Sequence, residues 1–394
     1  MANQATITLF EANDYFGGHS NTIIVPNGDV QHAIDTGFIV FNKRNYPLFT
    51  KLLEQIKVPY QASEMSFSFS SESHRLEYNG HDLRTLFAQK SNLLKPRFYR
   101  LLKDILAFHR DGKRYLNEAT APAYSIKAFT ERHGYSPWFW EVYLLPMVAA
   151  IWSSTPITVA TMPARFVLAF FENHGLLSIT DMPQWYTVTG GSQSYVKRLL
   201  EQFSGKAIKN AAVSKVLRDS TGVTVCIGAE QYRFDEVIFA CHSDTALKLI
   251  DQPREDEVNI LGGIPYQTNE VTLHTDISVM PKRQAVWASW NYHDTTKALP
   301  TLTYYMNRLQ ALKSSQNYFV SVNHAQRINP QHVLQNFSYS HPVLNQTSID
   351  AQSEFHKISG HSHSYFCGAY WFNGFHEDGV ASAVRVCQQL GVIF

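Results

Sequence analysis

Apolar and polar residues follow two different periods along this chain, and the period changes near residues 90 and 178. Before residue 90 the apolar residues come in short runs, as at residues 7–10, or alternate strictly with serine, as at residues 65–70. Both patterns indicate β-strands. Between residues 90 and 178 apolar residues recur every three or four positions, which is typical of amphipathic helices. The pattern therefore predicts a mixed α/β chain that contains one all-α block.

Prolines and capping residues mark the starts of the predicted helices. Pro47, Pro96 and Pro163 each precede an amphipathic run, and proline is favoured in the first turn of a helix. Ser136 followed by Pro137 is the pattern of an N-cap and a first helical residue. We therefore expect a helix at each of these positions. Further helices are expected at residues 192–203 and from about residue 378.

Strand patterns return after residue 178. Three short apolar runs beyond residue 212 predict a β-meander, and four more between residues 265 and 325 predict a second sheet. The last forty residues predict one strand before the final helix. The expected strands after residue 70 lie at residues 76–78, 213–217, 223–227, 234–240, 270–274, 285–290, 302–306, 318–322 and 365–371.

The strand at residues 7–10 ends in an acidic residue, Glu11. In a dinucleotide-binding unit, the acidic residue that binds a ribose ends the second strand and lies roughly 20 positions after a Gly-rich turn. Counting back from Glu11 by that distance runs past Met1. We therefore expect the chain to lack the first strand and its GxGxxG loop, with Met1 an internal methionine and the true start further upstream.

Composition and charge narrow the function classes. The 394 residues carry 34 Lys and Arg against 33 Asp and Glu, so the net charge of +1 gives no electrostatic argument for a nucleic-acid partner. Length favours two interleaved domains. Aromatic residues make up 13% of the chain, which favours an apolar binding cavity or an aromatic-rich core equally.

Cysteine usage and hydropathy bear on the cellular compartment. The four cysteines form no C-x-x-C pair and sit in apolar runs, which predicts free thiols in a reducing compartment and no metal site. No signal peptide and no run of 18 apolar residues is present. We expect a cytoplasmic protein, with peripheral contact to a membrane surface through the helical block as an extension of that expectation.

Longer strings along the whole chain carry a family resemblance. Residues 9–19 (LFEANDYFGGH), 35–42 (DTGFIVFN), 367–371 (CGAYW) and 374–379 (GFHEDG) resemble the bacterial FAD-dependent oxidoreductases of the flavin amine oxidase superfamily. Similar sequences form the N-terminal flavin region of plant cyclopropane fatty acid synthases. The resemblance implies a glutathione-reductase-like FAD-binding Rossmann domain, here without its first strand, interleaved with an α+β substrate domain of amine-oxidase type. The expected FAD domain comprises residues 1–50, 180–250 and 355–394, and the substrate domain residues 51–179 and 251–354.

The resemblance also implies which residues bind FAD. Glu11 would accept the ribose hydroxyls, unless it is merely an exposed residue at a strand end. The segment Gly374–Gly379 would bring the N-terminus of a helix to the flavin, where backbone amides stabilise negative charge at N1 and O2. The family pattern often has arginines around the Gly17-Gly18 pair, whereas this chain has Phe16 and His19 there. The cofactor-binding candidates are Glu11, Gly17, Gly18, His19, Asp35, Thr36, Gly37, Val213, Gly368, Gly374, Asp378 and Gly379.

The substrate side is less specified. No catalytic residue can be nominated, because hydride removal by a flavin needs mainly positioning and electrostatics. No cysteine is assigned to a covalent flavin link, and each aromatic candidate for the cavity would also suit a core. The cavity candidates are His174, Trp185, Trp287, Trp290, Tyr304, Asn307, Tyr370 and Trp371.

Three functions remain open at this stage. The leading one is hydride transfer from an organic substrate to FAD, with an unsaturated or methylated fatty acyl chain suggested by the kinship to cyclopropane synthases. That kinship also suggests association with a fatty acyl methyltransferase. The alternatives are an amine oxidase and a non-catalytic remnant or lipid-binding accessory. From the printed chain alone we expect weak or no FAD binding, because the phosphate-binding loop is missing.

Overall fold

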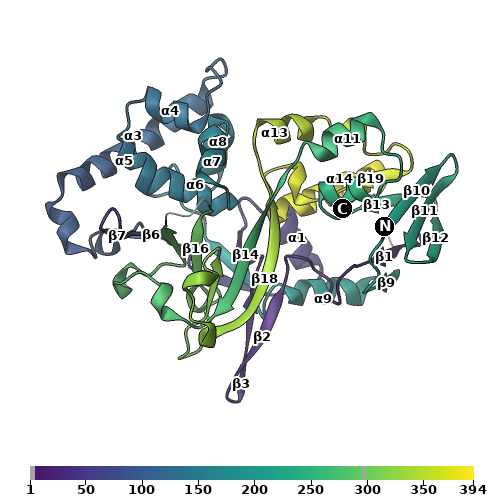
Figure 1. Cartoon of the computed structure of the whole chain (residues 1–394), viewed down its shortest axis with the longest axis horizontal. Coiled ribbons are helices and arrows are strands. Elements are labelled where there is room, and N and C mark those ends of the chain that lie inside the picture. The colour runs from purple at the N-terminus through teal and green to yellow at the C-terminus, as the bar shows by residue number, and fades with distance from the viewer. Residues whose placement is uncertain (1–4, 296–298) are drawn as a thin grey trace.

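The structure is a computed structural model that describes residues 5–295 and 299–394. Figure 1 shows a helical block on one side, a large sheet in the middle and a group of smaller sheets with flanking helices on the other side. Helices and strands thus mix as the sequence predicts, and the fold class is confirmed.

The helical block spans the region that the periodicity marks as all-α. Its longest member, α3, begins at Pro96, and Ser136 caps α5 by accepting a hydrogen bond from the backbone of Phe139 at 3.2 Å. One π-helical turn, Trp140–Leu144, separates α5 from α6. The helices of the block are α3 (Pro96–Asn117), α4 (Ile126–Arg132), α5 (Pro137–Phe139), α6 (Leu145–Trp152), α7 (Pro156–Thr161) and α8 (Ala164–Asn173).

A seven-stranded sheet lies beside this block. Its strand order is β18-β14-β17-β16-β15-β6-β7, and only the β15–β6 pair is parallel. The predicted pairing of the alternating strand at residues 65–70 with the strand at residues 76–78 is confirmed. The strands are β6 (Phe67–Ser71), β7 (Leu76–Asn79), β14 (Tyr266–His274), β15 (Trp290–Asp294), β16 (Thr301–Tyr305), β17 (Phe319–Val322) and β18 (Val333–Pro342).

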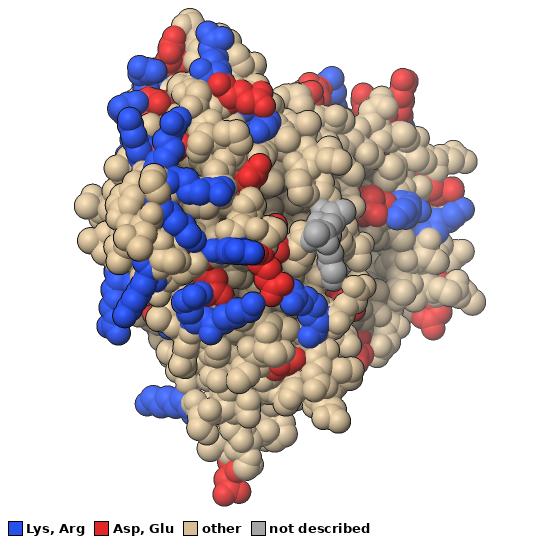
Figure 2. Space-filling model, turned by 60° about the vertical axis from the view of Figure 1, so that its left-hand side comes forward, with Lys and Arg blue, Asp and Glu red and all other residues tan. Residues whose placement is uncertain are grey.

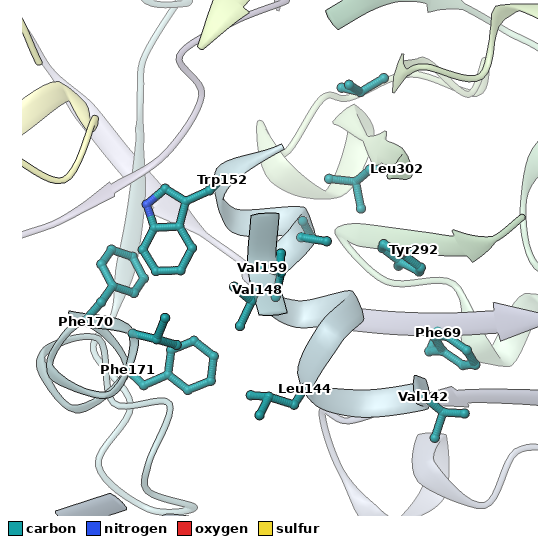
Figure 3. Packing of buried hydrophobic residues seen from close by; sticks show 14 of the residues in the cluster. Phe69, Val142, Leu144, Val148, Trp152, Val159, Phe170, Phe171, Tyr292 and Leu302 are labelled. Atoms are coloured by element: carbon teal, nitrogen blue, oxygen red, sulfur yellow. The ribbon is translucent and has the colours of Figure 1, made fainter. Parts of the chain in front are cut away.

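The main apolar core forms between the helical block and one face of this sheet. Figure 3 shows Trp152, Phe170 and Phe171 on the helical side and Phe69, Tyr292 and Leu302 on the strand side of the same cluster. Residues two apart on a strand share a face, which is why Tyr292 and Leu302, but not their chain neighbours, belong to it. A layer of helices on a sheet is therefore the scaffold of the predicted substrate domain.

The predicted Rossmann sheet is present as two separate parallel pairs. β1 (Thr8–Phe10) pairs with β9 (Lys206–Ile208), and β13 (Val237–Phe239) pairs with β19 (Ser364–Phe366). Among the described residues no backbone hydrogen bond joins one pair to the other. The two pairs therefore form separate two-stranded sheets among the described residues.

A meander, two small antiparallel sheets and several helices complete this half of the molecule. Arg218 of β10 makes a bidentate ion pair with the fully buried Glu257 of α11, at 2.6 and 2.8 Å. The strands are β2 (Thr22–Asn27) with β3 (Val30–Asp35), β4 (Phe41–Asn42) and β5 (Tyr60–Ser63) with β8 (Trp185–Val188), and β10 (Lys215–Asp219), β11 (Gly222–Ile227) and β12 (Glu230–Phe234). The helices outside the block are α1 (Pro47–Gln55), α2 (Leu83–Leu86), α9 (Gln193–Gln202), α10 (Ser243–Leu249), α11 (Glu255–Gly262), α12 (Met306–Leu309), α13 (Gln346–Ser353) and α14 (His376–Gln389).

Several predicted strands have wrong boundaries: β14 begins four residues before the predicted 270–274, and β10 lies two residues after the start of the predicted 213–217. Three others differ more. The strand expected at residues 285–290 begins only at Trp290, because the Trp287 indole and carbonyl bond to Pro281 and Arg308 instead of to a neighbouring strand. The strand expected at residues 234–240 is divided between β12 and β13, which pair with different sheets. The strand expected at residues 365–371 ends at Phe366, and a 3-10 turn, Ala369–Trp371, follows it.

Candidate functional site

Glu11 lies directly after β1, at the carboxyl end of a parallel strand pair. Its Oε1 accepts hydrogen bonds from the backbone N and the side-chain Nδ2 of Asn13, both at 2.9 Å. Its Oε2 has no hydrogen-bond partner among the described residues, and the side chain is only partly buried. One oxygen of the carboxylate is therefore held in place, and the other can accept hydrogen bonds from hydroxyl groups, as a ribose site requires.

The Gly17-Gly18 turn needs glycine for steric reasons. Both residues have positive φ, +123° and +55°, and a Cβ on Gly17 would lie 2.8 Å from the Gln193 side chain and from the Ser20 carbonyl oxygen. The Gln193 amide, at the start of α9, donates to the Phe16 carbonyl at 2.9 Å. The Gln193 side chain thereby fixes the turn against the start of α9.

Gly37 allows two chain segments to approach closely. A Cβ at this position would lie 2.2 Å from the carbonyl oxygen of His19, and the backbone of Phe38 donates to the same oxygen at 2.9 Å. Thr36 is buried and bonds to Asn21 and to the Tyr339 hydroxyl. The segment after β3 thus lies along the segment that follows the Gly17-Gly18 turn.

Asp35 has an internal role in the same region. Its buried carboxylate accepts hydrogen bonds from Thr22, from the backbone and hydroxyl of Ser192, and from Gln310, at 2.6 to 3.0 Å. Burial raises the pKa of Asp35 to about 6 in spite of these donors. The four donors occupy the carboxylate, so Asp35 acts on the site by fixing the strand that leads to Gly37.

The N-terminus of α14 meets these two segments. The His376 ring stacks on Phe38 with 3.8 Å between ring centroids, and its Nε2 lies 2.6 Å from the Tyr195 hydroxyl. Tyr195, on α9, also bonds to the Ser20 hydroxyl. The first amides of a helix lack intrahelical partners and carry partial positive charge. Three predicted strings, residues 9–19, 35–42 and 374–379, therefore converge where a helix can stabilise an anion.

Histidines gather on the other side of His19. The His19 ring lies 5.4 Å from that of His341, 6.0 Å from that of His242 and 4.7 Å from the Tyr339 ring. Burial and the neighbouring histidines lower the pKa of His19 to about 3, and burial lowers that of His341 to about 4 and that of His376 to about 3. These rings are therefore neutral at physiological pH.

An aromatic cluster adjoins the start of α14. Phe375 packs on Phe170 at 5.0 Å, and Phe170 contacts Trp152 at 4.8 Å and stacks on His174 at 3.8 Å. His174 lies 6.2 Å from Trp185, so two of the predicted cavity residues are brought together here. His174 Nδ1 is 2.9 Å from the Phe170 carbonyl, an arrangement in which it donates and leaves Nε2 as an acceptor.

This cluster borders a cavity of about 190 Å³, which we call the α8–α14 cavity. Two carboxylates line it. Asp378 accepts from the backbone of Phe375 at 2.8 Å, and Glu377 caps α1 by accepting from Leu48 and Phe49. Burial raises the pKa of Asp378 to about 6 and also raises that of Glu377. Its lining is Asn45, Tyr46, Phe166, Ala169, Phe170, Asn173, His174, Asn373, Phe375, Glu377 and Asp378.

The other predicted cavity residues do not gather at this cavity. Trp290 and Tyr304 are cross-strand partners on the sheet face that meets the helical block, and the Trp290 indole nitrogen is buried without a partner among the described residues. Trp287 packs against Tyr305 and Phe319, and so lies on the opposite face from Tyr304.

Three further predicted residues make contacts outside the α8–α14 cavity. Asn307 uses both ends of its amide on the backbone of residues 316–318. Tyr370 and Trp371 are almost fully buried in a second core cluster, next to α14. An aromatic residue near the end of a strand suits a core or a cavity equally well, so sequence alone could not separate these cases.

The remaining cofactor candidates lie around the site and not at the point where its segments meet. Val213 packs half-buried against the second core, and the Gly368 amide donates to Ser382 of α14 at 2.8 Å. Gly374 has φ +87°, while a Cβ on Gly379 would meet open space. Four residues that connect the site were not predicted: Ser20 and Tyr195 carried no separate sequence signal, whereas Phe38 and Phe375 lie within the quoted 35–42 and 374–379 strings.

The described residues contain no group of three or more His, Cys, Asp or Glu side chains that could hold a metal ion. No disulfide joins any of the four cysteines. None of the described helices is both long enough and apolar enough to span a bilayer.

Comparison with known proteins decides the family. A model described as flavin containing amine oxidoreductase matches residues 1–391. The chain belongs to the flavin-containing amine oxidoreductases. No curated protein matches this oxidoreductase in a sequence search. FAD is thus the cofactor that its family implies, as the sequence predicts.

Solved structures share the fold of this flavin-containing amine oxidoreductase. Cyclohexylamine oxidase from Brevibacterium oxydans IH-35A is 12% identical with a TM-score of 0.68, and the match covers 97% of this chain and 93% of that one. The CLA-producing fatty acid isomerase from P. acnes is 12% identical with a TM-score of 0.63, covering 98% and 92%. Reduced UDP-galactopyranose mutase is 13% identical with a TM-score of 0.67, covering 97% and 88%.

The residues present suit two ends of FAD. Glu11 has an oxygen available for the ribose, and glycine at positions 17 and 37 leaves backbone exposed where a side chain could not fit. At the other end, the first turn of α14 supplies helix amides beside Phe38 and His19. The flavin, when bound, supplies a two-electron acceptor. When FAD is bound, Glu11 would hold its ribose and the amides at the start of α14 would stabilise negative charge at its ring.

Replacing Glu11 tests the ribose end. Glu11→Gln should raise the FAD dissociation constant about tenfold or more, because a neutral amide replaces a carboxylate that accepts hydrogen bonds from the ribose hydroxyl groups. Flavin fluorescence titration measures this constant. Asp14→Asn makes the same change three residues on, at an exposed position, and should leave it unchanged. Equal FAD affinity of the wild-type protein and the Glu11→Gln variant would show that Glu11 does not bind the ribose.

Acid should destabilise the fold through its neutral histidines. The pKa values of His19, His174, His341 and His376 are all lowered to about 3 or 4, so the unfolded chain binds more protons once the pH falls below about 6.5. The loss is about 2 kcal/mol per histidine at pH 5. Because the pKa values of Asp35 and Asp378 are raised, these two groups instead stabilise the folded chain as the pH falls from about 7 to about 5, by about 1 kcal/mol each.

The net result is a loss of stability between about pH 6.5 and pH 4. Urea unfolding followed at about pH 7.5 and about pH 5 measures it as a lower midpoint at the acidic pH. His341→Gln should reduce the pH dependence, since it removes one of the four groups. Stability that is constant or rises toward pH 5 would contradict the account of neutral, buried histidines.

Proposed function

We propose that this chain is an FAD-dependent oxidoreductase that removes a hydride equivalent from a small amine bound in the α8–α14 cavity. The observation that carries the proposal is the lining of that cavity. It combines aromatic rings with the carboxylate of Asp378, and no Lys or Arg is among its lining residues. An uncompensated carboxylate among aromatic rings favours a cationic ligand.

Size supports the same choice. A cavity of about 190 Å³ is smaller than the 300 Å³ or more typical of sites for drug-sized ligands. The sequence resemblance favours a fatty acyl substrate, which would need a longer apolar channel. The α8–α14 cavity lies next to the first turn of α14 and is small, so its geometry favours the alternative that the sequence ranked second.

Each residue of the cavity has a distinct role in this proposal. Asp378, ionised above its pKa of about 6, attracts the ammonium group and orients the substrate. His174 Nε2 accepts a hydrogen bond from the same group, since Nδ1 is committed to Phe170. Phe170 and Phe375 exclude water from the carbon that loses the hydride. His174 is a positioning residue, because its lowered pKa makes it a poor proton acceptor.

A fatty acyl substrate is the second candidate, supported by a different observation. The aromatic cluster is continuous with the large apolar core between the helical block and the sheet, where Trp290 and Tyr304 are only partly buried. An acyl chain would have to enter along this layer. Association with a fatty acyl methyltransferase belongs to this candidate and is a proposal with it.

Anaerobic reduction of the FAD-loaded protein distinguishes the two substrates. Cyclohexylamine should bleach the visible absorbance of the flavin, whereas oleic acid and its methylated analogue should not. Asp378→Asn should raise KM for the amine about tenfold with a smaller change in kcat, since it removes the charge that attracts the ammonium. In the wild-type protein, KM should rise as the pH falls through about 6, and this rise should be absent in the variant.

Asp350→Asn serves as the matched control. It makes the same substitution at an exposed position on α13 and should change neither KM nor its pH dependence. Bleaching by the fatty acid alone would establish the second candidate. Bound FAD that neither compound reduces would contradict both.

A further inference from the structure

The helical block exposes apolar side chains at one end. Leu94 is 87% exposed and Leu93 49%, both at the end of the 3-10 helix η1 (Lys90–Leu94). Tyr99 and Leu106, on the adjoining helix α3, are about half exposed. The Tyr99 hydroxyl donates to the Leu93 carbonyl at 2.9 Å, which shows that η1 and the start of α3 form one surface.

The same surface is strongly basic. From residue 83 to residue 103 the sequence contains six Lys and Arg and no Asp or Glu, in a chain whose net charge is +1. Figure 2, which brings the helical block forward, shows Lys and Arg side chains gathered over it. We call this surface the basic apolar face. Its members are Lys90, Leu93, Leu94, Lys95, Arg97, Tyr99, Arg100, Lys103 and Leu106.

Most of these charges are not neutralised by the protein. Among the described residues, Lys90, Lys95, Arg97 and Lys103 take part in no ion pair, while Arg100 pairs with Asp104. The Arg97 guanidinium lies over the Trp138 ring at 4.0 Å and keeps its charge. Partial burial and the charges of Arg97 and Arg283 lower the pKa of Lys95, so the basic groups are close enough to repel one another. An anionic partner would relieve this repulsion.

The exposed leucines show which kind of anionic partner suits the face. Phosphates of a nucleic acid are bound by Lys and Arg, and bases stack on aromatic rings, but neither contact uses an aliphatic side chain that is 87% exposed. A lipid bilayer offers both environments at once. Its anionic headgroups attract Lys and Arg, and its acyl boundary takes up leucine and tyrosine side chains.

We propose that the basic apolar face docks this protein on an anionic lipid bilayer. Leu93 and Leu94 enter the headgroup boundary, Tyr99 lies at the level of the headgroups, and Lys90 and Lys103 contact lipid phosphates. Docking uses none of the residues assigned to the FAD site or to the α8–α14 cavity, so it is independent of the proposed substrate. It places the helical block, which covers the aromatic cluster, toward the membrane.

Vesicle sedimentation of the whole protein tests the proposal. Binding to vesicles of phosphatidylcholine with phosphatidylglycerol should be at least about tenfold tighter than to phosphatidylcholine alone, and about 0.5 M salt should abolish it. Leu94→Ser should weaken binding about tenfold, since one inserted leucine is lost. Lys90→Gln with Lys103→Gln should weaken it by a similar factor.

Matched controls distinguish docking by the basic apolar face from nonspecific binding to vesicles. Ile157→Ser replaces an equally exposed side chain on α7 that has no basic neighbours in sequence, and Lys206→Gln with Lys209→Gln removes the same charge at and directly after β9. Both controls should bind like the wild-type protein. Every substituted side chain is exposed, so thermal unfolding should be unchanged throughout.

Two results would overturn the proposal. One is vesicle binding that is absent or equally tight with and without phosphatidylglycerol. The other is tight binding of a short oligonucleotide, insensitive to Leu94→Ser, by a protein that does not bind vesicles, which would assign the face to nucleic acid. Activity of the enzyme in solution bears on the proposed function alone.

Discussion

The close contact between Gly37 and His19 is the constraint on which the rest of the site depends. A side chain at position 37 would clash with the His19 carbonyl oxygen, so the segment after β3 can lie against the Gly17-Gly18 turn only through glycine. This contact places Phe38 for stacking on His376, and the hydrogen bonds of Tyr195 then connect α9 and α14 to the same point. Segments more than 300 residues apart in sequence thereby form one surface.

Burial determines which side chains in this region carry a charge. Asp35 holds its strand through four hydrogen bonds, while the histidines around His19 stay neutral because their surroundings exclude water. A neutral polar wall is compatible with a cofactor whose reduced ring carries negative charge, since the helix amides of α14 then supply the stabilising dipoles. The acidic groups lie on the cavity side instead, where they favour a cation. The two sides of the α14 N-terminus thus have opposite electrostatic preferences.

Much of the fold could be predicted from sequence, because local signals agree with it. Prolines start α1 and α3, Ser136 caps α5, and strict alternation marks β6. The strings at residues 9–19 and 374–379 predict parts of one site, and Tyr195 connects Ser20, next to the first string, with His376 in the second. What failed depends on distant contacts: Trp287 leaves its strand to bond Pro281, and Tyr370 and Trp371 fill a second core. The Tyr195–His376 contact joins residues 181 apart, which no local pattern could indicate.

We propose that FAD binds where the Gly17-Gly18 turn, the Gly37 segment and α14 converge. Flavin fluorescence titration and thermal unfolding of Gly37→Ala and Gly80→Ala test this placement. Gly80 directly follows β7, outside this site, and has open space around it, so its alanine variant should bind FAD like the wild-type protein. Gly37→Ala should bind at least about tenfold more weakly, since a methyl group must push the two segments apart. A Gly37→Ala protein with unchanged FAD affinity and unchanged stability would contradict the account.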